Sequence, residues 1–337
     1  MTSSNKQNAV AVVLCTFNGE KHIEAQLDSL LSQSHAVDIH VFDDHSTDST
    51  LALLEEFNKA NAVLEIHRSK ENTGYVKNFE TGISTVLERG YGYIALSDQD
   101  DIWEPDKIAL AVQAAKSLEQ KQGLTTPVLV HSDLQMIDAN EHLVHHSFLQ
   151  YRGYEISEHK HLAKILGQNG VMGNTVLMNS ALASMAMPVP SGIHVHDYWL
   201  AVVAELFGHR VMIDKPLVKY RIHAGNASNS TSSVRFGVEK WLSKKSWRGF
   251  VTRDYRLPFK EDTRAGGIDT LLAQDNGLPP LQPEQEYLIR LFKRYLEFTD
   301  SRSALFFSMM KHGFFKKGLA HRLRLAYSML LTKRYSN

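Results

Sequence analysis

Residues 9–33 read AVAVVLCTFNGEKHIEAQLDSLLSQ, and the class of the fold follows from them. They begin with the apolar run AVAVVLC, whose β-branched side chains are typical of a strand buried on both faces of a parallel sheet. From residue 19 onward the apolar side chains follow helical spacing, at Ile23, Leu27, Leu30 and Leu31. A buried strand that leads through a short turn into an amphipathic helix is the repeating unit of α/β proteins.

The same alternation of strand and helix continues to residue 120. Further strands are predicted at 39–42, 62–67 and 93–97, and further helices around 51–57, 75–89 and 106–120. Strands joined by helices in this way predict an α/β fold, with a right-handed, mostly parallel sheet flanked by helices.

The second half of the chain is less regular. Short strands are predicted at 128–131, 174–178 and 210–221, and a helix at 198–207. Residues 226–233, NASNSTSS, are the most polar stretch, so we expect a domain boundary there. The expected domains are residues 1–230, which contain the sheet, and residues 231–337, a basic helical region.

Composition excludes several classes of protein. The chain of 337 residues has 37 Lys and Arg against 37 Asp and Glu, so its formal net charge is zero. This excludes a general polyanion binder, and without a nucleic-acid-reading motif no nucleic-acid partner is expected. The single cysteine, Cys15, excludes an intrachain disulfide and a CxxC metal site. No apolar run reaches roughly 18 residues and the first residues are polar, so we expect no transmembrane helix, no signal peptide and a cytoplasmic location.

Acidic residues cluster at the C-terminal ends of two predicted strands, where ligands bind in open α/β sheets. DDHSTDST at 43–50 follows the second strand, and DQDD at 98–101 follows the fourth. Carboxylates one residue apart, such as Asp98 and Asp100, can present oxygens to one hard cation such as Mg²⁺ or Mn²⁺. Aspartate is also common in turns, which is the alternative interpretation of each cluster. Two clusters at equivalent ends of one sheet favour a ligand site.

Other ligand motifs are absent from the sequence. An EF-hand loop beginning at Asp98 would need glycine at position 103 and glutamate at position 109, where the chain has Trp103 and Ala109. There is no GxxxxGK[ST] P-loop, and TFNG at 16–19 follows the first strand where a dinucleotide-binding protein has its GxGxxG turn. Nucleotide phosphates would therefore need a metal to hold them.

These residues belong to a longer, ordered set of motifs. The set consists of VVLCTFNGEKHIEAQLDSLLSQ at 12–33, DDHSTDST at 43–50, ENTGYVKNF at 71–79, YIALSDQDDIWEPDK at 93–107, GNTVLMN at 173–179, HDYWLA at 196–201 and YRIHAGN at 220–226. Over about residues 9–228, the chain resembles the family 2 glycosyltransferases of the GT-A fold, particularly bacterial rhamnosyltransferase-like members. The resemblance implies metal-dependent, inverting transfer of a sugar, with rhamnose favoured, from a UDP- or dTDP-sugar. The implied acceptor is a hydroxyl of a polysaccharide, such as O-antigen or capsule, or of a lipid-linked glycan.

The resemblance assigns donor-binding roles to several residues. Thr16, Phe17 and Asn18 line the base pocket, Asp44 accepts a hydrogen bond from N3–H of uracil or thymine, and Lys77 and Asn78 lie near the nucleotide. An ionised carboxylate only accepts hydrogen bonds, so Asp44 suits both bases and disfavours cytosine. It does not separate UDP from dTDP.

The DxD motif is the implied metal site. By resemblance, Asp98 lies toward the ribose and the metal, and Asp100 is the more direct ligand of Mn²⁺ or Mg²⁺. His223 resembles a late histidine that contacts the metal or the diphosphate, and Arg221 is an alternative contact for phosphate. Asp101 is expected to cap the following turn or to orient its neighbours.

Asp197 matches the catalytic base of the family. An inverting transfer needs a carboxylate beside the acceptor hydroxyl, opposite the leaving nucleotide. The alternative is that Asp197 is the N-cap of the helix predicted at 198–207. His196 precedes it, at a position where many relatives have a second acid. If that position adjusts the basicity of Asp197, the adjustment differs in this chain.

Residues 302–334 contain eight Lys and Arg, no Asp or Glu, and twelve large apolar side chains. This composition is typical of a helix that attaches to an anionic membrane surface, which would place the enzyme at the inner face of the membrane. The alternative is a helix that packs its apolar side on the catalytic domain.

Two other functions remain open from the sequence. A nucleotidyltransferase acting on a sugar phosphate also uses aspartate pairs on an α/β sheet, but it releases pyrophosphate. A non-catalytic module that only binds sugar nucleotides is the other, and the presence of all the expected acidic residues argues against it.

Overall fold

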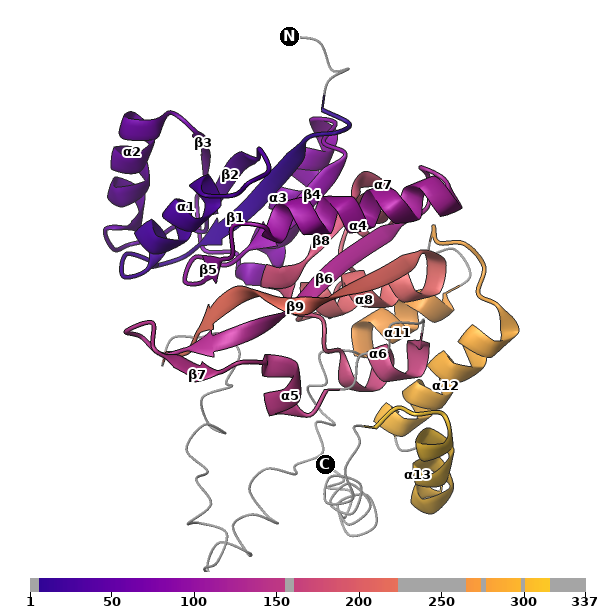
Figure 1. Cartoon of the computed structure of the whole chain (residues 1–337). Coiled ribbons are helices and arrows are strands. Elements are labelled where there is room, and N and C mark those ends of the chain that lie inside the picture. Colours follow the sequence, from indigo (N-terminus) through magenta and orange to yellow (C-terminus); the bar gives the residue numbers. More distant parts are fainter. Residues whose placement is uncertain (1–5, 155–160, 224–264, 274–276, 298–300, 316–337) are drawn as a thin grey trace, which may run out of the picture.

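The structure is a computed structural model, and it describes residues 6–154, 161–223, 265–273, 277–297 and 301–315. Its first half has four parallel strands: β1 (Val10–Thr16), β2 (Asp38–Asp43), β3 (Leu64–Arg68) and β4 (Tyr93–Ser97). Helices follow them: α1 (Ile23–Leu31), α2 (Thr50–Asn61), α3 (Tyr75–Glu88) and α4 (Lys107–Gln122). The prediction of an α/β fold is confirmed (Figure 1).

The second half of the sheet is mixed rather than parallel. Its strands are β5 (Ile102–Trp103), β6 (Val128–Ile137), β7 (Leu143–His145), β8 (Leu177–Asn179) and β9 (His209–Arg221). The order across the sheet is β3-β2-β1-β4-β8-β6-β9-β5, with β7 paired to β6. Strand β8 runs antiparallel to both β4 and β6, and β5 runs antiparallel to β9, so the parallel pattern ends at β4.

Both faces of the sheet are covered, which explains the unbroken apolar run at its centre. All seven residues of β1 are buried. Val10, Val12 and Leu14 lie in one core with side chains of α1, α2 and α4, while Ala11 and Val13 lie in a second core with α3. A strand between two layers has no solvent face, so it shows no alternation of apolar and polar residues.

The second core extends into the C-terminal part of the chain. It joins α6 (Leu162–Gln168), α7 (Ser180–Ala186) and α8 (His196–Phe207) to α11 (Ala265–Leu272), α12 (Pro283–Glu297) and α13 (Arg302–Lys311). In Figure 1 α11 and α12 lie beside α6 and α8, and α13 lies beyond α12. The remaining short elements are α5 (Phe148–Arg152) and a 3-10 turn at Gly173–Thr175.

The described part of the basic tail is packed against the rest of the protein. Leu305, Met309 and Phe314 are at most 2% exposed and belong to the second core. Phe314 stacks on Phe292 of α12 with ring centroids 5.8 Å apart. For residues 302–315 the packing alternative therefore holds. Residues 316–337, and the domain boundary predicted at 226–233, lie outside the described residues. Within the described parts, no helix is long and apolar enough to cross a membrane.

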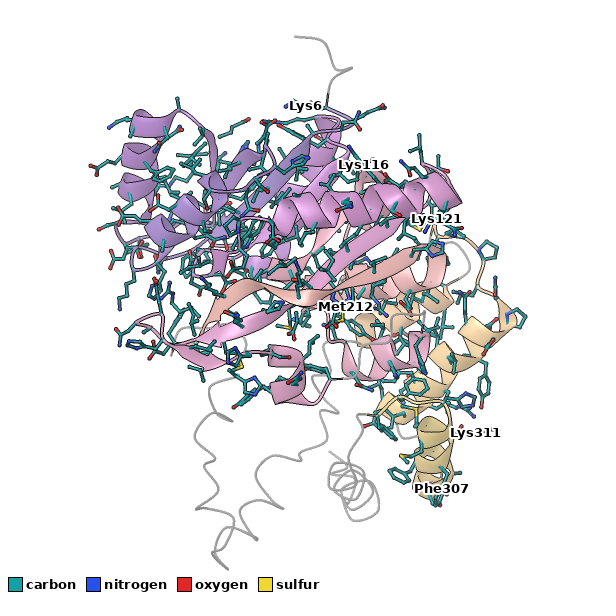
Figure 2. The ribbon with its side chains drawn as sticks, in the orientation of Figure 1. Lys6, Lys116, Lys121, Met212, Phe307 and Lys311 are labelled. Atoms are coloured by element: carbon teal, nitrogen blue, oxygen red, sulfur yellow. The ribbon has the colours of Figure 1, made fainter. Side chains whose placement is uncertain are left out.

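A pair of phenylalanines tests whether this segment is structural. Phe314→Ala should lower the free energy of unfolding by about 3–5 kcal/mol, because it empties a buried site. Phe307→Ala is the matched control: Phe307 is 70% exposed on α13 (Figure 2), so its loss should change stability by no more than about 0.5 kcal/mol. Urea unfolding of both variants provides the measurement. Equal effects would show that α13 does not depend on this contact.

Candidate active site

The loop after β1 is tied to the acidic segment after β2. Asp43 is fully buried and accepts hydrogen bonds from Thr16 Oγ1 and from the backbone N–H of Ser46, both at 3.0 Å. The backbone N–H of Asn18 donates to Ser46 Oγ at 2.9 Å, and Asn18 Oδ1 accepts from the N–H of Thr47 at 2.9 Å. Asn18 has φ of 49°, a left-handed conformation that asparagine tolerates better than most residues.

The same loop is tied to the DQDD segment after β4. The side-chain amide of Gln99 accepts from the N–H of Phe17 at 2.8 Å and donates to the carbonyl of Phe17 at 2.9 Å. This bracket holds the backbone of Phe17, while its ring stays 44% exposed. The predicted base-pocket residues 16–18 are therefore hydrogen-bonded to both acidic segments, and the ring of Phe17 is the part that remains exposed.

Asp44 fixes the start of α3. Its side chain is 2% exposed, and its two oxygens accept from the backbone N–H groups of Thr73 and Gly74, each at 2.8 Å. Asn78 is also buried and donates to the carbonyl of Phe42 at 2.8 Å, so its amide ties α3 to β2. Lys77, in contrast, is exposed and pairs with Glu80 at 2.5 Å.

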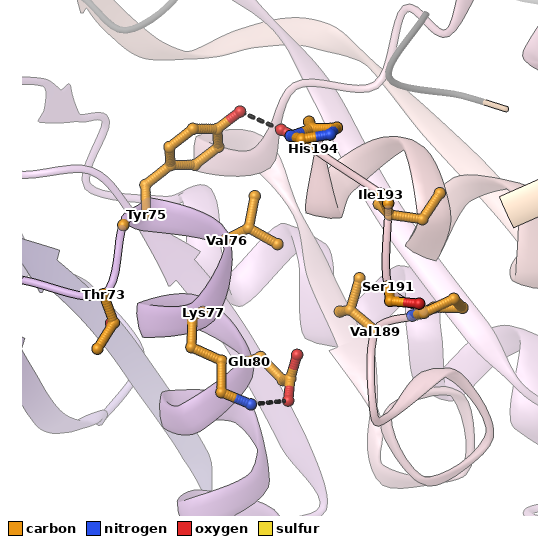
Figure 3. A pocket seen from close by; sticks show the side chains of 12 residues that line it. Thr73, Tyr75, Val76, Lys77, Glu80, Val189, Ser191, Ile193 and His194 are labelled. Carbon is orange, nitrogen blue, oxygen red and sulfur yellow. Dashed lines mark hydrogen bonds and ion pairs between the residues drawn. The ribbon is translucent and has the colours of Figure 1, made fainter. Parts of the chain in front are cut away.

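Lys77 lies in a pocket between the start of α3 and the loop before α8. The pocket has a volume of about 350 Å³ and is lined by Thr73 to Lys77, Glu80 and Val189 to His194. Figure 3 shows the Tyr75 hydroxyl pointing across it to the carbonyl of His194, to which it donates a hydrogen bond. The loop fixed by Asp44 therefore forms one wall of the pocket.

Strand pairing brings the two ends of the predicted metal site together. In the antiparallel pair of β5 and β9, Ile102 lies opposite Lys219, so the residues before β5 meet those after β9. Asp100 Oδ2 is consequently 2.8 Å from His223 Nε2. Asp101 is buried and accepts from Asn174 Nδ2 at 2.5 Å and from the N–H of Arg221 at 3.3 Å. Asp101 thus orients its neighbours, one of its two expected roles.

Two predicted ligands differ from expectation in their surroundings. The Arg221 side chain is 2% exposed, and its guanidinium donates to the carbonyl of Asp100, the carbonyl of Ala139 and the carboxylate of Glu141 at 3.0–3.3 Å. It braces the β6–β7 connection rather than facing open space. Asp98 does not join Asp100 and His223 in a compact trio. Among the described residues, the one trio of His, Cys, Asp or Glu side chains with donor atoms within 4.8 Å of one another lies elsewhere.

His22 is a member of this site that the sequence analysis missed. Its ring lies 5.2 Å from the ring of His223. Burial lowers the pKa of His22, and the positive charge of Arg221 acts in the same direction. The only signal in the sequence was its position just after the turn that contains Phe17 and Asn18.

Asp197 lies in the first turn of α8, but it is not the N-cap, because the helix starts at His196 and Val195 precedes it. Its carboxylate is 8% exposed and accepts from Asn169 Nδ2 at 3.1 Å and from the N–H of Gly173 at 2.9 Å. Burial raises the pKa of Asp197 to about 6, although these hydrogen bonds act against the rise.

His196 contributes no charge beside Asp197. It is buried and stacks on Phe79 with ring centroids 4.2 Å apart. Burial lowers the pKa of His196 to about 3, so the ring is neutral near pH 7. The position that many relatives fill with an acid is therefore a packing position in this chain.

Asp98 and Asp197 belong to one electrostatic environment. Burial raises the pKa of Asp98 to about 7, and the charges of Asp100 and Asp197 add to the rise. Burial also raises the pKa of the Tyr75 hydroxyl, with Asp197 and Asp98 contributing. The contacts agree: Gly173 donates to Asp197 and Asn174 donates to Asp101 after β4, while the Tyr75 ring lies 6.1 Å from the ring of His196, which precedes Asp197.

Comparison with known proteins identifies the family. The family model described as Glycosyl transferase family 2 matches residues 11–126. The chain carries a family 2 glycosyltransferase domain. An uncharacterised glycosyltransferase of Haemophilus influenzae is 28% identical to this chain over 251 residues. The match covers 72% of this chain and 73% of the Haemophilus protein. The dTDP-rhamnosyl transferase RfbG of Shigella flexneri is 45% identical over 103 residues, 29% of this chain and 35% of RfbG.

A solved structure supports the fold of the glycosyltransferase. The structure of S. aureus TarS residues 1–349 with UDP-GlcNAc superposes with a TM-score of 0.54 and 16% identity, covering 95% of this chain and 79% of that one. At this identity the likeness shows the GT-A fold alone.

The raised pKa values predict how stability responds to pH. A carboxyl whose pKa is raised by folding stabilises the fold only while protonated, so stability should fall as the pH rises from about 4 through 7. Asp98→Asn removes one such group, and each pKa unit is worth about 1.4 kcal/mol. Without metal at pH 8 we expect the variant to be more stable than wild type by at least about 1 kcal/mol, with a smaller difference at pH 5.

Thermal melts at both pH values test this expectation. Asp214→Asn is the control, because Asp214 is exposed and should show no pH-dependent gain. The expectation fails if the stability gained by Asp98→Asn over wild type is the same at pH 8 and at pH 5. That result would show that folding does not raise the pKa of Asp98.

Proposed function

We propose that the enzyme transfers a sugar, with inversion, from a UDP- or dTDP-sugar to a hydroxyl of a polysaccharide or lipid-linked glycan. The observation that carries the proposal is the link between Asp197 and the DQDD segment: the N–H of Gly173 donates to Asp197 at 2.9 Å, and the side chain of the next residue, Asn174, donates to Asp101 at 2.5 Å. A base beside the donor-binding acids is what an inverting transfer requires.

Asp197 is suited to the role of general base. A carboxylate with a pKa near 6 is ionised at neutral pH and is a stronger base than an exposed aspartate. The hydrogen bonds from Asn169 and from the N–H of Gly173 hold its two oxygens in place. Its proposed task is to accept the proton of the acceptor hydroxyl as that oxygen attacks the anomeric carbon.

The donor diphosphate is proposed to bind with Mn²⁺ or Mg²⁺ at Asp100 and His223, with Asp98 toward the ribose. A carboxylate and an imidazole 2.8 Å apart form a partial ligand set that suits such an ion. When bound, the metal would neutralise negative charge that develops on the leaving diphosphate. Arg221, as placed, would act by holding the backbone of Asp100 rather than by touching phosphate.

The nucleotide base is proposed to lie against the exposed ring of Phe17, in the turn formed with Thr16 and Asn18, with Asp44 as its hydrogen-bond acceptor. TarS binds UDP-GlcNAc, which supports a uracil nucleotide, and RfbG is named a dTDP-rhamnosyl transferase, which supports thymine and rhamnose. Lys77 is placed on the pocket wall, where it can reach the donor or the acceptor.

Replacing Asp197 tests the proposal. Asp197→Asn should reduce the turnover number by about 10²–10⁴-fold, the usual contribution of a general base, while donor affinity stays unchanged. In wild type the rate should fall as the pH drops below about 6, because the carboxylate becomes protonated. Asp214→Asn, which changes an exposed acid, is the control.

The released product separates the alternatives in the same assay. A glycosyltransferase releases the nucleoside diphosphate, whereas a nucleotidyltransferase releases pyrophosphate. Full activity of Asp197→Asn would remove this residue from the reaction, and donor binding without any turnover in wild type would favour a non-catalytic module.

Membrane attachment is proposed for the residues after Phe315, because the residues before it are packed in the core. Six cations follow: Lys316, Lys317, Arg322, Arg324, Lys333 and Arg334. Each can contribute about 1 kcal/mol at an anionic surface. This would hold a cytoplasmic enzyme at the inner face of the membrane, near a lipid-linked acceptor.

Cosedimentation with vesicles tests the attachment. The full-length chain should bind anionic vesicles and not neutral ones, and binding should weaken as salt shortens the Debye length from about 10 Å at 0.1 M to about 3 Å at 1 M. A chain that ends at Phe315 keeps the buried residues of α13 and should not bind. Equal binding by the shortened chain would place the contact elsewhere.

A further inference from the structure

A cluster of two histidines and a glutamate lies on β2 and β3, away from the DxD segment. His40 and Glu65 are register partners in this parallel pair, and His67 follows Glu65 by two residues, so all three side chains lie on one face. Their donor atoms all lie within 4.8 Å of one another. Strand β3 is the edge of the sheet (Figure 1). The Glu65 side chain is 48% exposed, so the cluster is accessible from that side.

The hydrogen bonds around His40 fix which ring nitrogen carries its proton. Tyr91 donates its single hydroxyl proton to Asp38 at 2.6 Å, and its oxygen accepts from Lys6 at 2.7 Å. His40 Nε2 lies 3.0 Å from the same oxygen, so it must be the donor. His40 Nδ1 therefore carries a bare lone pair in the neutral ring.

That lone pair points at a carboxylate. His40 is 2% exposed, its Nδ1 has no hydrogen-bond partner, and Nδ1 lies 3.5 Å from Glu65 Oε2. His67 Nε2 is likewise buried without a partner, 3.4 Å from Glu65 Oε1. Burial favours neutral imidazoles at both positions. His40 Nδ1 and Glu65 Oε2 are thus two acceptors that face each other, and they repel unless a cation lies between them.

The distances fit a tetrahedral ion better than hydrogen bonds. Ligands at about 2.0–2.1 Å from Zn²⁺ are separated by about 3.4 Å along each tetrahedral edge. The separations of 3.5 Å from His40 Nδ1 to Glu65 Oε2 and of 3.4 Å from His67 Nε2 to Glu65 Oε1 are close to that edge, one at each carboxylate oxygen, and both exceed the usual hydrogen-bond range. The contact from His40 through Tyr91 to Asp38 also resembles the outer support that metal-bound histidines have.

We propose that His40, Glu65 and His67 form a zinc-binding site, which joins the edge strand β3 to β2 independently of the catalytic metal. Two imidazoles and a carboxylate leave one position of Zn²⁺ for water. The bound ion would stabilise the strand that ends at Asp43, which holds the loop of the candidate active site. The proposal does not depend on the proposed function.

Arg89 is the competing cation at this cluster. Its guanidinium pairs with Glu65 Oε2, the oxygen that faces His40. Zinc binding requires Arg89 to share or release that oxygen. Removing the guanidinium should therefore tighten zinc binding. If the cluster were only an ion pair beside two neutral histidines, removing Arg89 would have no such effect.

Zinc binding to the full chain tests the site, measured by equilibrium dialysis after chelator treatment, with excess Mg²⁺ present to occupy the hard oxygen ligands. His67→Phe keeps the ring that stacks on Phe42 at 4.5 Å but removes a ligand, and Glu65→Gln removes another at the surface. Both should weaken the tightest zinc site by roughly 100-fold or more, and Tyr91→Phe by about 10–100-fold. Arg89→Ala should bind zinc more tightly than wild type.

The control is His142→Gln, which removes the histidine of an exposed pair with Asp138 and should leave zinc binding unchanged. Zinc should also raise the melting temperature of wild type but not of Glu65→Gln. The proposal is overturned if wild type binds no zinc under these conditions. It is equally overturned if His67→Phe and Glu65→Gln bind zinc as tightly as wild type, in which case the cluster is an Arg89–Glu65 ion pair beside two neutral histidines.

Discussion

Carboxylates crowd the carboxyl edge of the sheet, and the fold has to hold them there at a cost in desolvation. The groups that hold them are mostly neutral donors: Asn174 for Asp101, Asn169 and a backbone N–H for Asp197, and two backbone N–H groups for Asp44. Neutral donors orient a carboxylate without cancelling its charge. Burial raises the pKa values of Asp98 and Asp197, and the charges of Asp100 and Asp197 add to the rise at Asp98. The cation that we propose for this edge would offset that repulsion.

Chain topology assembles this edge from distant segments. The pairing of β5 with β9 brings His223 to Asp100, more than 120 residues earlier in the sequence. Helix α8 shares a core with β4, and the consecutive residues Gly173 and Asn174 donate to Asp197 on α8 and to Asp101 after β4, which joins the two segments. The C-terminal helices share the core of α6 and α8, so they support the half of the site that carries the proposed base.

The sequence predicted the elements well where one local pattern determines them. The strand β1 was found because burial on two faces gives an unbroken apolar run. The acidic segments at 43–50 and 98–101 were found because each directly follows a predicted strand. The antiparallel strand β8 could not be oriented in advance, since three residues carry no information about their partners. The burial of Asn78 and Arg221, the place of His22, and the trio of His40, Glu65 and His67 depend on register and packing between segments, which no single segment encodes.

The most direct test of the account is calorimetric titration of UDP and dTDP into the wild-type chain and into Asp100→Ala, each with Mn²⁺ and with EDTA. The account predicts that one or both nucleotides bind wild type strongly only when Mn²⁺ is present. It also predicts that Asp100→Ala binds weakly and equally in both conditions. Equal affinity of wild type with Mn²⁺ and with EDTA, or wild-type affinity in Asp100→Ala, would contradict the claim that this carboxylate edge is a metal-dependent donor site.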